Sequence, residues 1–229
     1  MVEYLKERAS FSIVLIAIIG GFVFLMAHGK GTATSAPSQS ANAPSPTAAM
    51  QSPMSRGSKT AKVSLIQYSD FLCPSCSYFT TQVMPTIQQK YIDTGKVKFE
   101  FRPIAFIAEG STLADEGAYC ATDQGKFWGY HDAVYAFVWN TAFSKGVDPK
   151  TTTILTTPIL DTLASTIGLD SNAFSDCLSS GKYAARVSDA TTTASNQGVT
   201  STPYILVNGK QLTGNPSVQT VEALIESQL

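Results

Sequence analysis

The sequence predicts an α/β fold in which a β-α-β unit and a β-β-α unit flank an inserted all-helical domain, behind an N-terminal transmembrane helix and a flexible linker. Three observations support this prediction. Short apolar runs of strand character occur near residues 63–68, 96–102 and 203–213. Between the last two runs, from about residue 105 to 198, the pattern is helical almost throughout. An uncharged, mostly apolar run covers residues 9–27.

The N-terminal apolar run is predicted to be a membrane anchor. Residues 1–8 are then a short cytoplasmic N-terminus, and residues 9–28 form a transmembrane helix whose uncharged run is about 28 Å long, close to the thickness of a bilayer's hydrocarbon core. Lys6 and Arg8 precede the helix, whereas only Lys30 follows it closely. The positive-inside rule therefore places the N-terminus in the cytoplasm and the rest of the chain outside.

A cleaved signal peptide is the alternative interpretation of this run. Cleavage requires small residues at positions −3 and −1, and cleavage after Ala27 would place Leu25 at −3. Cleavage after Ala33 or Ala36 would leave a long gap beyond the apolar core. We therefore favour an uncleaved anchor, and both interpretations take the downstream chain across the membrane.

Residues 29–60 are predicted to be a disordered linker. They are rich in Ala, Ser, Thr, Pro, Gly and Gln and show no apolar period. A flexible chain of this length spans roughly 30 Å. The whole chain has a formal net charge of −1 and no basic run downstream, which argues against binding to nucleic acid or to acidic lipid surfaces.

The globular part is predicted to span residues 61–229 and to begin with a strand at 63–68. A helix is expected over residues 73–91, with Pro85 bending it. The apolar face of this helix recurs at steps of four residues: Phe79, Val83, Ile87 and Tyr91. An Asp-Thr-Gly turn then leads into the alternating strand KVKFEFR at 96–102.

The helical insertion, about residues 105–198, is predicted to contain several helices that end at glycine- or proline-containing turns. They are expected near residues 110–123, 126–143, 151–167, 171–180 and 183–197. The insertion thus separates the two β-containing units in the sequence.

Beta structure returns in the C-terminal part. A strand is expected at 203–207, followed by an Asn208-Gly209 hairpin turn and a return strand at 211–213. A helix at 217–228 closes the chain. Its inward-facing residues are expected to be Val221, Leu224 and Ile225.

Cys73 and Cys76 form a Cys-x-x-Cys motif at the junction of a predicted strand and a predicted helix. Cys73 lies in the first helical turn, where free backbone amides and the helix dipole stabilise a thiolate, the reactive form of cysteine. Cys76 lies one turn later on the same side, close enough to close a disulfide. We therefore predict a redox pair in which Cys73 attacks or is attacked and Cys76 resolves the mixed disulfide.

A zinc site and a purely structural disulfide are the two other interpretations of this motif. Zinc needs four ligands, or three and a water molecule. Besides the cysteines, the chain offers only His28 and His131, and no remaining candidate has a ligand-like spacing. A structural disulfide fits the strand-to-helix junction less well. We therefore expect no metal and no other cofactor.

Cys120 and Cys177 lie on separate predicted helices of the insertion. In an oxidising compartment two remaining cysteines usually pair, so a structural disulfide is expected here. It would close a loop of about 58 residues, which contributes about 4 kcal/mol to stability in the chain-entropy model. Free buried thiols and a second redox couple are the alternatives.

Three segments carry a family resemblance: SLIQYSDFLCPSCSYF, AYCATDQGKFWGYHDAVY and GVTSTPYILVNGKQLTG. Together they resemble the DsbA-like thioredoxin proteins, most closely the membrane-anchored bacterial branch, over roughly residues 61–229. The resemblance implies a thioredoxin fold with an inserted helical domain. It also implies that Pro203 is cis and packs against the redox pair, so that the backbone of Thr202 is free to pair with an extended substrate peptide.

This sequence departs from the family pattern at two places. Proteins similar to thioredoxin usually carry a buried acid six residues before the first cysteine, where this chain has Gln67, so a carboxylate relay to Cys76 is in doubt. Between the cysteines stand Pro74 and Ser75, where the best-known oxidant of the family has Pro-His. One source of thiolate stabilisation is therefore missing, and a milder oxidant is expected.

By resemblance, the expected function is that of an extracytoplasmic oxidase, a protein disulfide oxidoreductase that donates its disulfide to secreted or membrane proteins. Its expected partners are unfolded or reduced client proteins and a membrane protein that reoxidises it, similar to DsbB or VKOR. A reductase or isomerase of the same fold, and a non-enzymatic binding module on a thioredoxin scaffold, are the alternatives.

The remaining candidates have simpler interpretations. His131 is expected to be an ordinary helix residue rather than a catalytic base, and Asp70 a turn or cap residue. Glu109, Asp115 and Glu116 are interpreted as a solvated first helical turn. The aromatic-rich stretch is expected to be core, with an apolar substrate groove as the alternative. It comprises Phe127, Trp128, Tyr130, Tyr135, Phe137 and Trp139.

Overall fold

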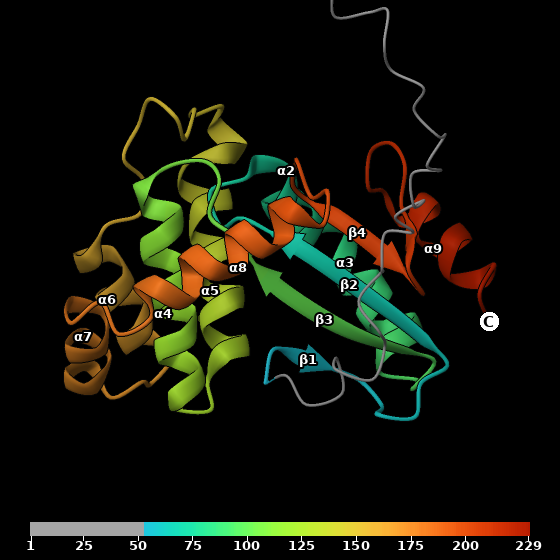
Figure 1. Cartoon of the computed structure of the whole chain (residues 1–229), viewed down its shortest axis with the longest axis horizontal. Helices are drawn as coiled ribbons and strands as arrows, with labels where there is room; N and C mark the ends of the chain where they lie inside the picture. Colours follow the sequence, from blue (N-terminus) through green and yellow to red (C-terminus); the bar gives the residue numbers. More distant parts are fainter. Residues whose placement is uncertain (1–52) are drawn as a thin grey trace, which may run out of the picture. The chain divides into compact units, whose positions relative to one another are not determined.

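The structure is a computed structural model that describes residues 53–229. A mixed five-stranded sheet, in the order β1-β3-β2-β4-β5, forms its centre (Figure 1). Its strands are β1 (Ser55–Arg56), β2 (Val63–Ser69), β3 (Val97–Pro103), β4 (Tyr204–Val207) and β5 (Lys210–Gln211). β2 and β3 run parallel, whereas β4 is antiparallel to β2. This arrangement confirms the predicted β-α-β and β-β-α units.

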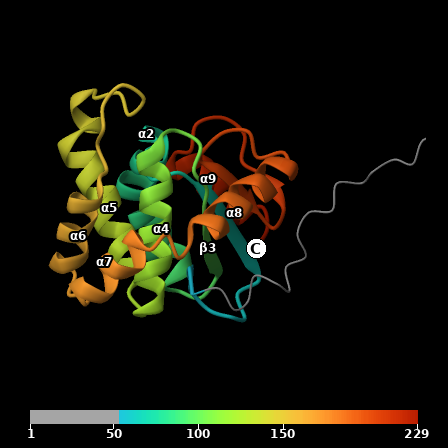
Figure 2. The same cartoon turned by 60° about the vertical axis from the view of Figure 1, so that its left-hand side comes forward.

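Most helices of the insertion gather beside the sheet, the last of them crosses one face of the sheet, and the remaining helices lie with the strands (Figures 1 and 2). The insertion helices are α4 (Glu109–Asp123), α5 (Phe127–Thr141), α6 (Thr157–Thr166), α7 (Ser171–Ser179) and α8 (Ala184–Asn196). The others are α2 (Pro74–Tyr78), α3 (Met84–Ile87) and α9 (Val218–Glu226). The insertion has no core of its own, because residues from its helices and from the sheet form one continuous hydrophobic cluster.

The central strand β2 supplies side chains to both faces of the sheet, as its period of two requires. Val63 and Leu65 join the main hydrophobic cluster, whereas Ile66 and Tyr68 point to a second, smaller cluster that α8 covers through Ala194. Because both faces are covered, β2 is apolar or buried along most of its length. Its C-terminal end, which leads into the Cys-x-x-Cys segment, is therefore firmly held.

The prediction that the linker extends to residue 60 is wrong, because residues 54–56 already belong to the folded domain. β1 pairs antiparallel with β3, Met54 is buried, and the Met54 carbonyl accepts a hydrogen bond from the Phe101 amide at 3.0 Å. Pairing of this short strand protects the edge of β3, which explains why an apparently irregular segment is ordered. The rest of the predicted linker lies outside the described residues.

The helix predicted over 73–91 is interrupted by π-helical turns at Phe79–Val83 and Gln88–Ile92. The Met84 amide donates to the carbonyl of Phe79, five residues earlier, directly before Pro85. Proline lacks an amide hydrogen and its ring crowds the preceding turn, so a wider turn there accommodates it.

The helix predicted over 151–167 starts later than expected. α6 begins at Thr157, with Pro158 in its first turn and Thr156 in extended conformation before it. Ile154 and Leu155 are buried in the preceding irregular segment. Proline favours the first turn of a helix, where its missing amide hydrogen leaves no intrahelical bond unmade, which explains why α6 begins next to Pro158.

The C-terminal hairpin has the predicted turn. Asn208 and Gly209 both have positive φ, of 48° and 80°, which is the backbone geometry of a tight hairpin turn. The return strand β5 is at Lys210–Gln211 rather than 211–213. In the closing helix α9, Val221 and Ile225 are fully buried.

The predicted membrane anchor at 9–28 lies outside the described residues. Among residues 53–229, no helix has the length and apolar character needed to cross a bilayer.

Candidate active site

Cys73 caps the N-terminus of α2, directly after the turn that follows β2. Its backbone is extended, and its Sγ accepts a hydrogen bond from the Cys76 amide at 3.3 Å. Pro74 occupies the first helical turn, where a missing amide hydrogen costs nothing. Pro74 and Ser75 are exposed, so they form the outer surface of the motif. The short loop thus presents the Cys73 sulfur at a helix start.

The two sulfurs of the motif are free thiols in unequal environments. Cys73 is 5% exposed, whereas Cys76 is completely buried. A hydrogen bond from the Cys76 side chain is the main reason that the pKa of Cys73 falls to about 7, against the opposing effect of burial. Burial and the neighbouring Cys73 raise the pKa of Cys76 well above its ordinary range. Cys73 is therefore the thiol that ionises first.

Thr202 and Pro203 lie beside Cys73 because β4 starts next to the end of β2. Tyr204 pairs with Tyr68 across the two strands, and the Thr202–Pro203 peptide bond is cis. The Cys73 thiol donates a hydrogen bond to the Thr202 carbonyl at 3.3 Å. The Thr202 side chain also lowers the pKa of Cys73. The carbonyl therefore stabilises the neutral thiol, and the hydroxyl stabilises the thiolate.

Asp70 is more than the predicted turn residue. Its buried carboxylate accepts a hydrogen bond from the Leu72 amide at 2.7 Å, and so caps the turn before Cys73. It also accepts from the amides of Phe106 and Ile107 at 2.7 and 3.0 Å. A fourth hydrogen bond comes from the Ser111 hydroxyl at 2.7 Å. Burial raises the pKa of Asp70, and these four donors oppose that rise.

Asp70 therefore joins three segments that are distant in the sequence: the turn after β2, the loop after β3 and the first turn of α4. Sequence reasoning missed this role because only the turn partner is local. The one available signal is a charged residue directly before two large apolar residues, in the run Tyr68-Ser69-Asp70-Phe71-Leu72.

Gln67 is completely buried on β2. Its amide Nε2 donates to the Ser69 hydroxyl at 2.9 Å, and Ser69 Oγ lies 2.7 Å from the Tyr135 hydroxyl. The Ser69 side chain lowers the pKa of Cys76. Ser69 and Tyr135 are thus site residues that sequence reasoning did not identify. Ser69 shares a strand face with Gln67, which was a usable signal, whereas Tyr135 was interpreted only as core.

His131 is buried in an aromatic cluster, 4.6 Å from Phe101 and 5.0 Å from Tyr135 between ring centroids. Its Nδ1 lies 2.7 Å from a carboxylate oxygen of Asp132. Burial lowers the pKa of His131, which keeps the ring neutral. None of its contacts within the described residues is with Cys73 or Cys76, which supports a structural role.

The interpretation of Asp115 and Glu116 as solvated is wrong. Glu109 is exposed, but Asp115 is completely buried and Glu116 nearly so. Within residues 53–229, neither carboxylate oxygen of Asp115 has a hydrogen-bond partner, and burial raises its pKa well above the ordinary range. The reason is tertiary: α4 packs against α5, α6, α7 and α8, so little of its surface remains for water.

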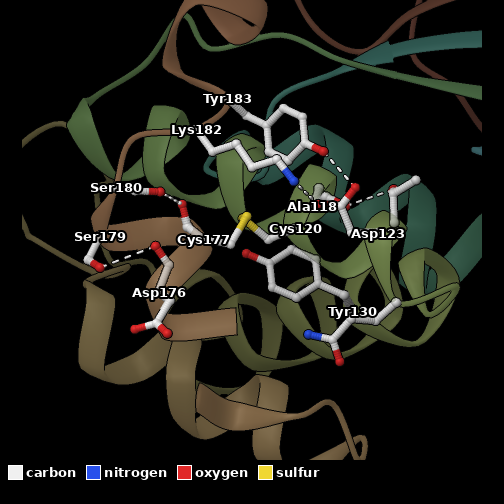
Figure 3. The surroundings of a disulfide bond; sticks show 12 residues. Ala118, Cys120, Asp123, Tyr130, Asp176, Cys177, Ser179, Ser180, Lys182 and Tyr183 are labelled. Atoms are coloured by element: carbon white, nitrogen blue, oxygen red, sulfur yellow. Dashed lines mark hydrogen bonds and ion pairs between the residues drawn. A yellow bond between two sulfur atoms is a disulfide. The ribbon is translucent and has the colours of Figure 1, made fainter. Parts of the chain in front are cut away.

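The second cysteine pair lies away from the motif. A disulfide joins Cys120 on α4 to Cys177 on α7, with 5.9 Å between the two Cα atoms (Figure 3). Nearby, Asp123 accepts hydrogen bonds from Lys182 at 2.7 Å and from Tyr183 at 2.6 Å. This group of contacts ties α4 to α7 and to the start of α8. Within the described part of the chain, no cluster of three or more His, Cys, Asp or Glu side chains could hold a metal ion.

Comparison with known proteins agrees with this geometry. Residues 49–227 match the family described as thioredoxin. The disulfide bond formation protein D of Bacillus subtilis (strain 168) is 27% identical over 76% of this chain and 75% of its own length. The crystal structure of oxidised BdbD from Bacillus subtilis aligns with a TM-score of 0.66 and 25% identity, over 76% of this chain and 91% of that one.

A third comparison supports the fold alone. The crystal structure of Wolbachia pipientis alpha-DsbA1 aligns with a TM-score of 0.63 and 22% identity, over 76% of this chain and 89% of that one. The family match, over residues 49–227, includes the sheet, the helical insertion and the Cys-x-x-Cys segment. The chain therefore belongs to the thioredoxin family, within its DsbA-like group of thiol–disulfide oxidoreductases.

Proposed function

We propose that this protein is an extracytoplasmic oxidase that donates the Cys73–Cys76 disulfide to secreted or membrane proteins through a mixed-disulfide intermediate. The observation that carries this proposal is the inequality of the two sulfurs. Cys73 is the more accessible and has a pKa of about 7, whereas Cys76 is fully buried with a raised pKa. An attacking thiolate reaches Cys73 first, and the Cys73 thiolate is the better leaving group.

Transfer of the disulfide to a client takes two steps. A client thiolate attacks Cys73 Sγ, the Cys73–Cys76 bond breaks, and Cys76 leaves as a thiolate that takes up a proton. A second client thiolate then attacks the client sulfur of the mixed disulfide and releases the Cys73 thiolate. The client loses two electrons and gains a disulfide, and the enzyme is left as a dithiol. We further propose that the Thr202 backbone pairs with the extended client segment during both steps, and the nearness of its carbonyl to the Cys73 sulfur supports this role.

At neutral pH the lowered pKa of Cys73 makes the pair only slightly more oxidising than a pair with ordinary thiols. A lowered pKa of Cys73 stabilises the reduced enzyme. This stabilisation is complete above pH 9.0, the ordinary pKa of the thiol, and is lost as the pH falls through about 7. At pH 7 about half of Cys73 is ionised, which favours the reduced form about twofold, or roughly 10 mV. The full effect of roughly 60 mV is reached only near pH 9 and above. Ser75 between the cysteines is consistent with this moderate shift.

Continuous turnover requires reoxidation of the dithiol. We propose a membrane protein similar to DsbB or VKOR as the oxidant, and the predicted anchor at residues 9–28 would hold the enzyme near it, with the N-terminus inside. The names of the Bacillus relatives refer to disulfide bond formation, which supports the oxidative direction. The extracytoplasmic location is proposed because disulfides form and persist mainly in oxidising compartments outside the cytoplasm.

The proposal is tested with the full chain in detergent micelles and a reduced, unfolded client whose native disulfide restores a measurable activity. We expect client oxidation with the native enzyme, none with Cys73→Ser, and an accumulated mixed disulfide with Cys76→Ser. The reduction potential against glutathione should lie well above −200 mV for an oxidase, whereas a thioredoxin-like reductant lies near −270 mV. Undiminished client oxidation by Cys73→Ser would disprove the proposed chemistry, and a potential near −270 mV would reverse its direction.

A further inference from the structure

The four hydrogen bonds of Asp70 fill the lone-pair positions of an ionised carboxylate. Oδ1 accepts from the Leu72 amide and from the Ser111 hydroxyl, both at 2.7 Å. Oδ2 accepts from the amides of Phe106 at 2.7 Å and Ile107 at 3.0 Å. A carboxylate offers about four such positions, whereas a protonated carboxyl must place a hydrogen on one of its oxygens. The geometry therefore fits the ionised form of Asp70.

No cation neutralises this charge among the residues that the structure describes. The four donors are three backbone amides and one hydroxyl, and none of the ion pairs within residues 53–229 includes Asp70. The side chain is completely buried, so salt and water screen it little. The titratable groups that face it are Cys73 and Cys76 on α2, Asp115 on α4 and Tyr135 on α5, and none of these can carry a positive charge.

One tight turn joins Asp70 to Cys73. The Cys73 amide donates to the Asp70 carbonyl oxygen at 3.0 Å, and the Leu72 amide between them donates to the Asp70 carboxylate at 2.7 Å. Standard bond lengths then keep the Cys73 sulfur within about 11 Å of that carboxylate oxygen. In a protein interior, a negative charge at this separation reduces the ionisation constant of a thiol about tenfold. The Asp70 charge is thus close enough to act on Cys73.

We propose that the Asp70 carboxylate is a fixed negative charge that limits how much charge Cys73 can carry, and so makes the enzyme a weaker oxidant. Cys73 is neutral in the disulfide, so the charge acts only on the reduced protein, where it destabilises the Cys73 thiolate. A less stable reduced form means a lower tendency to donate the disulfide. Asp70 acts through Cys73 and is therefore a positioning residue. This inference rests on disulfide exchange at Cys73–Cys76, not on the oxidative direction.

The helical insertion takes part in this arrangement. Three of the four donors lie outside the turn that contains Asp70: the amides of Phe106 and Ile107 in the loop after β3, and the hydroxyl of Ser111 in the first turn of α4. Burial alone favours the neutral acid, and these donors oppose that effect. The loop and α4 thus keep the charge in place beside the redox pair of the sheet half.

The test replaces Asp70 by asparagine in the full chain in detergent micelles. Asparagine has nearly the same shape and keeps an oxygen for the Leu72 amide, but it carries no charge. The pKa of Cys73, followed by the ultraviolet absorbance of its thiolate, should fall from about 7 by about one unit. At pH 7 the equilibrium with glutathione should shift about fivefold toward the dithiol, which raises the reduction potential by roughly 20 mV.

The pH dependence of this change separates charge from shape. The shift in the equilibrium should approach tenfold at about pH 9, where both proteins hold Cys73 as a thiolate, and vanish at about pH 5, where both hold it as a thiol. Loss of the turn alone acts in the opposite direction. A displaced Cys73 loses the hydrogen bonds from the Cys76 side chain and amide that lower its pKa, so its pKa would rise.

Asp170→Asn is the matched control. Asp170 is an exposed aspartate whose carboxylate caps α7 by accepting from the Ala173 amide at 3.0 Å. Its replacement removes the same charge and a similar contact, and both the pKa of Cys73 and the potential should stay native. Asp70→Ser is a second variant, because a serine hydroxyl can also accept from an amide two residues later. It carries the test if thermal unfolding shows that Asp70→Asn does not fold.

Each outcome decides the inference. A lowered pKa of Cys73 in a folded Asp70 variant, with a rise in potential that disappears at about pH 5, supports it. A pKa that is unchanged or raised in the folded variant would overturn it, and so would a change in potential that is equal at about pH 5 and pH 9. Failure of the proposed function appears differently, as client oxidation that persists in Cys73→Ser.

Discussion

The sheet half of the molecule and its helical insertion each contain a cysteine pair and a completely buried aspartate, but the bonding of these groups differs between the two regions. Around the sheet, Cys73 and Cys76 are free thiols three positions apart, and Asp70 accepts four hydrogen bonds. In the insertion, Cys120 and Cys177 are joined by a disulfide, and Asp115 has no hydrogen-bond partner among residues 53–229.

The difference shows that neighbours, rather than residue type, decide the role of a side chain. The first pair lies at the start of α2, where Cys73 Sγ accepts a hydrogen bond from the Cys76 amide and donates one to the Thr202 carbonyl. Its sulfurs can therefore exchange disulfide partners. The second pair bridges two helices in a packed region, so its bond restrains the fold. Asp70, with its four hydrogen bonds, organises loops around the site. Asp115, which has no hydrogen-bond partner among the described residues, carries a free-energy cost of burial that increases when it ionises.

The prediction with the largest expected effect is that Cys120–Cys177 contributes to stability but not to disulfide exchange at Cys73–Cys76. Replacing Cys120 and Cys177 together by alanine should lower the free energy of unfolding by about 4 kcal/mol, because the unfolded chain is no longer cross-linked. Urea unfolding of the oxidised protein measures this loss. At a temperature where the variant is folded, its rate of client oxidation should equal that of the native enzyme. A loss of exchange activity in the folded variant would show that the two regions are not independent.

The prediction of intermediate size concerns the pH dependence of stability that Asp115, in contrast to the hydrogen-bonded Asp70, is expected to cause. The raised pKa of Asp115 means that the native state keeps a proton above pH 3.8, so stability declines as the pH rises, by up to about 1.4 kcal/mol per unit until that pKa is passed. Asp115→Asn should remove this slope and make the protein more stable than the native form at pH 7. Denaturant unfolding from pH 4 to 8 measures both curves.

Glu109→Gln supplies the control for this prediction, because Glu109 lies on the same helix but is exposed. It removes an equal charge without removing a buried acid, and its stability curve should run parallel to the native one. Parallel curves for Asp115→Asn as well would mean that Asp115 does not titrate as its burial implies.

The smallest effect concerns position 67 in the sheet half. Gln67→Glu replaces the amide that donates to Ser69 with a carboxyl group that, when ionised, accepts the Ser69 hydrogen instead. We expect release of glutathione from Cys73 to change a few-fold at pH 7 and to show an additional ionisation between pH 5 and 9. Gln82→Glu is the control, since Gln82 is an exposed glutamine in the turn after α2. An unchanged rate across this pH range would contradict the prediction.

Much of the fold was predictable from local patterns. The short apolar run at 63–68 and the alternating run at 96–102 correspond to β2 and β3, and the Asn208-Gly209 pair marks the turn between β4 and β5. These features depend on period and turn chemistry within a few residues, which a sequence displays directly. β1 was missed, because two residues carry no period and their pairing with β3 is a long-range contact.

The sequence by itself determined the redox motif: two cysteines three positions apart at a strand-to-helix junction, with a threonine-proline pair before the last strands. Only the tertiary structure decided which polar side chains serve that motif. The partners of Asp70 lie in three separate segments, Ser69 meets Tyr135 across 66 positions, and Asp115 is buried by four helices. Burial and hydrogen bonding depend on which surfaces meet, and no local pattern of residues records that.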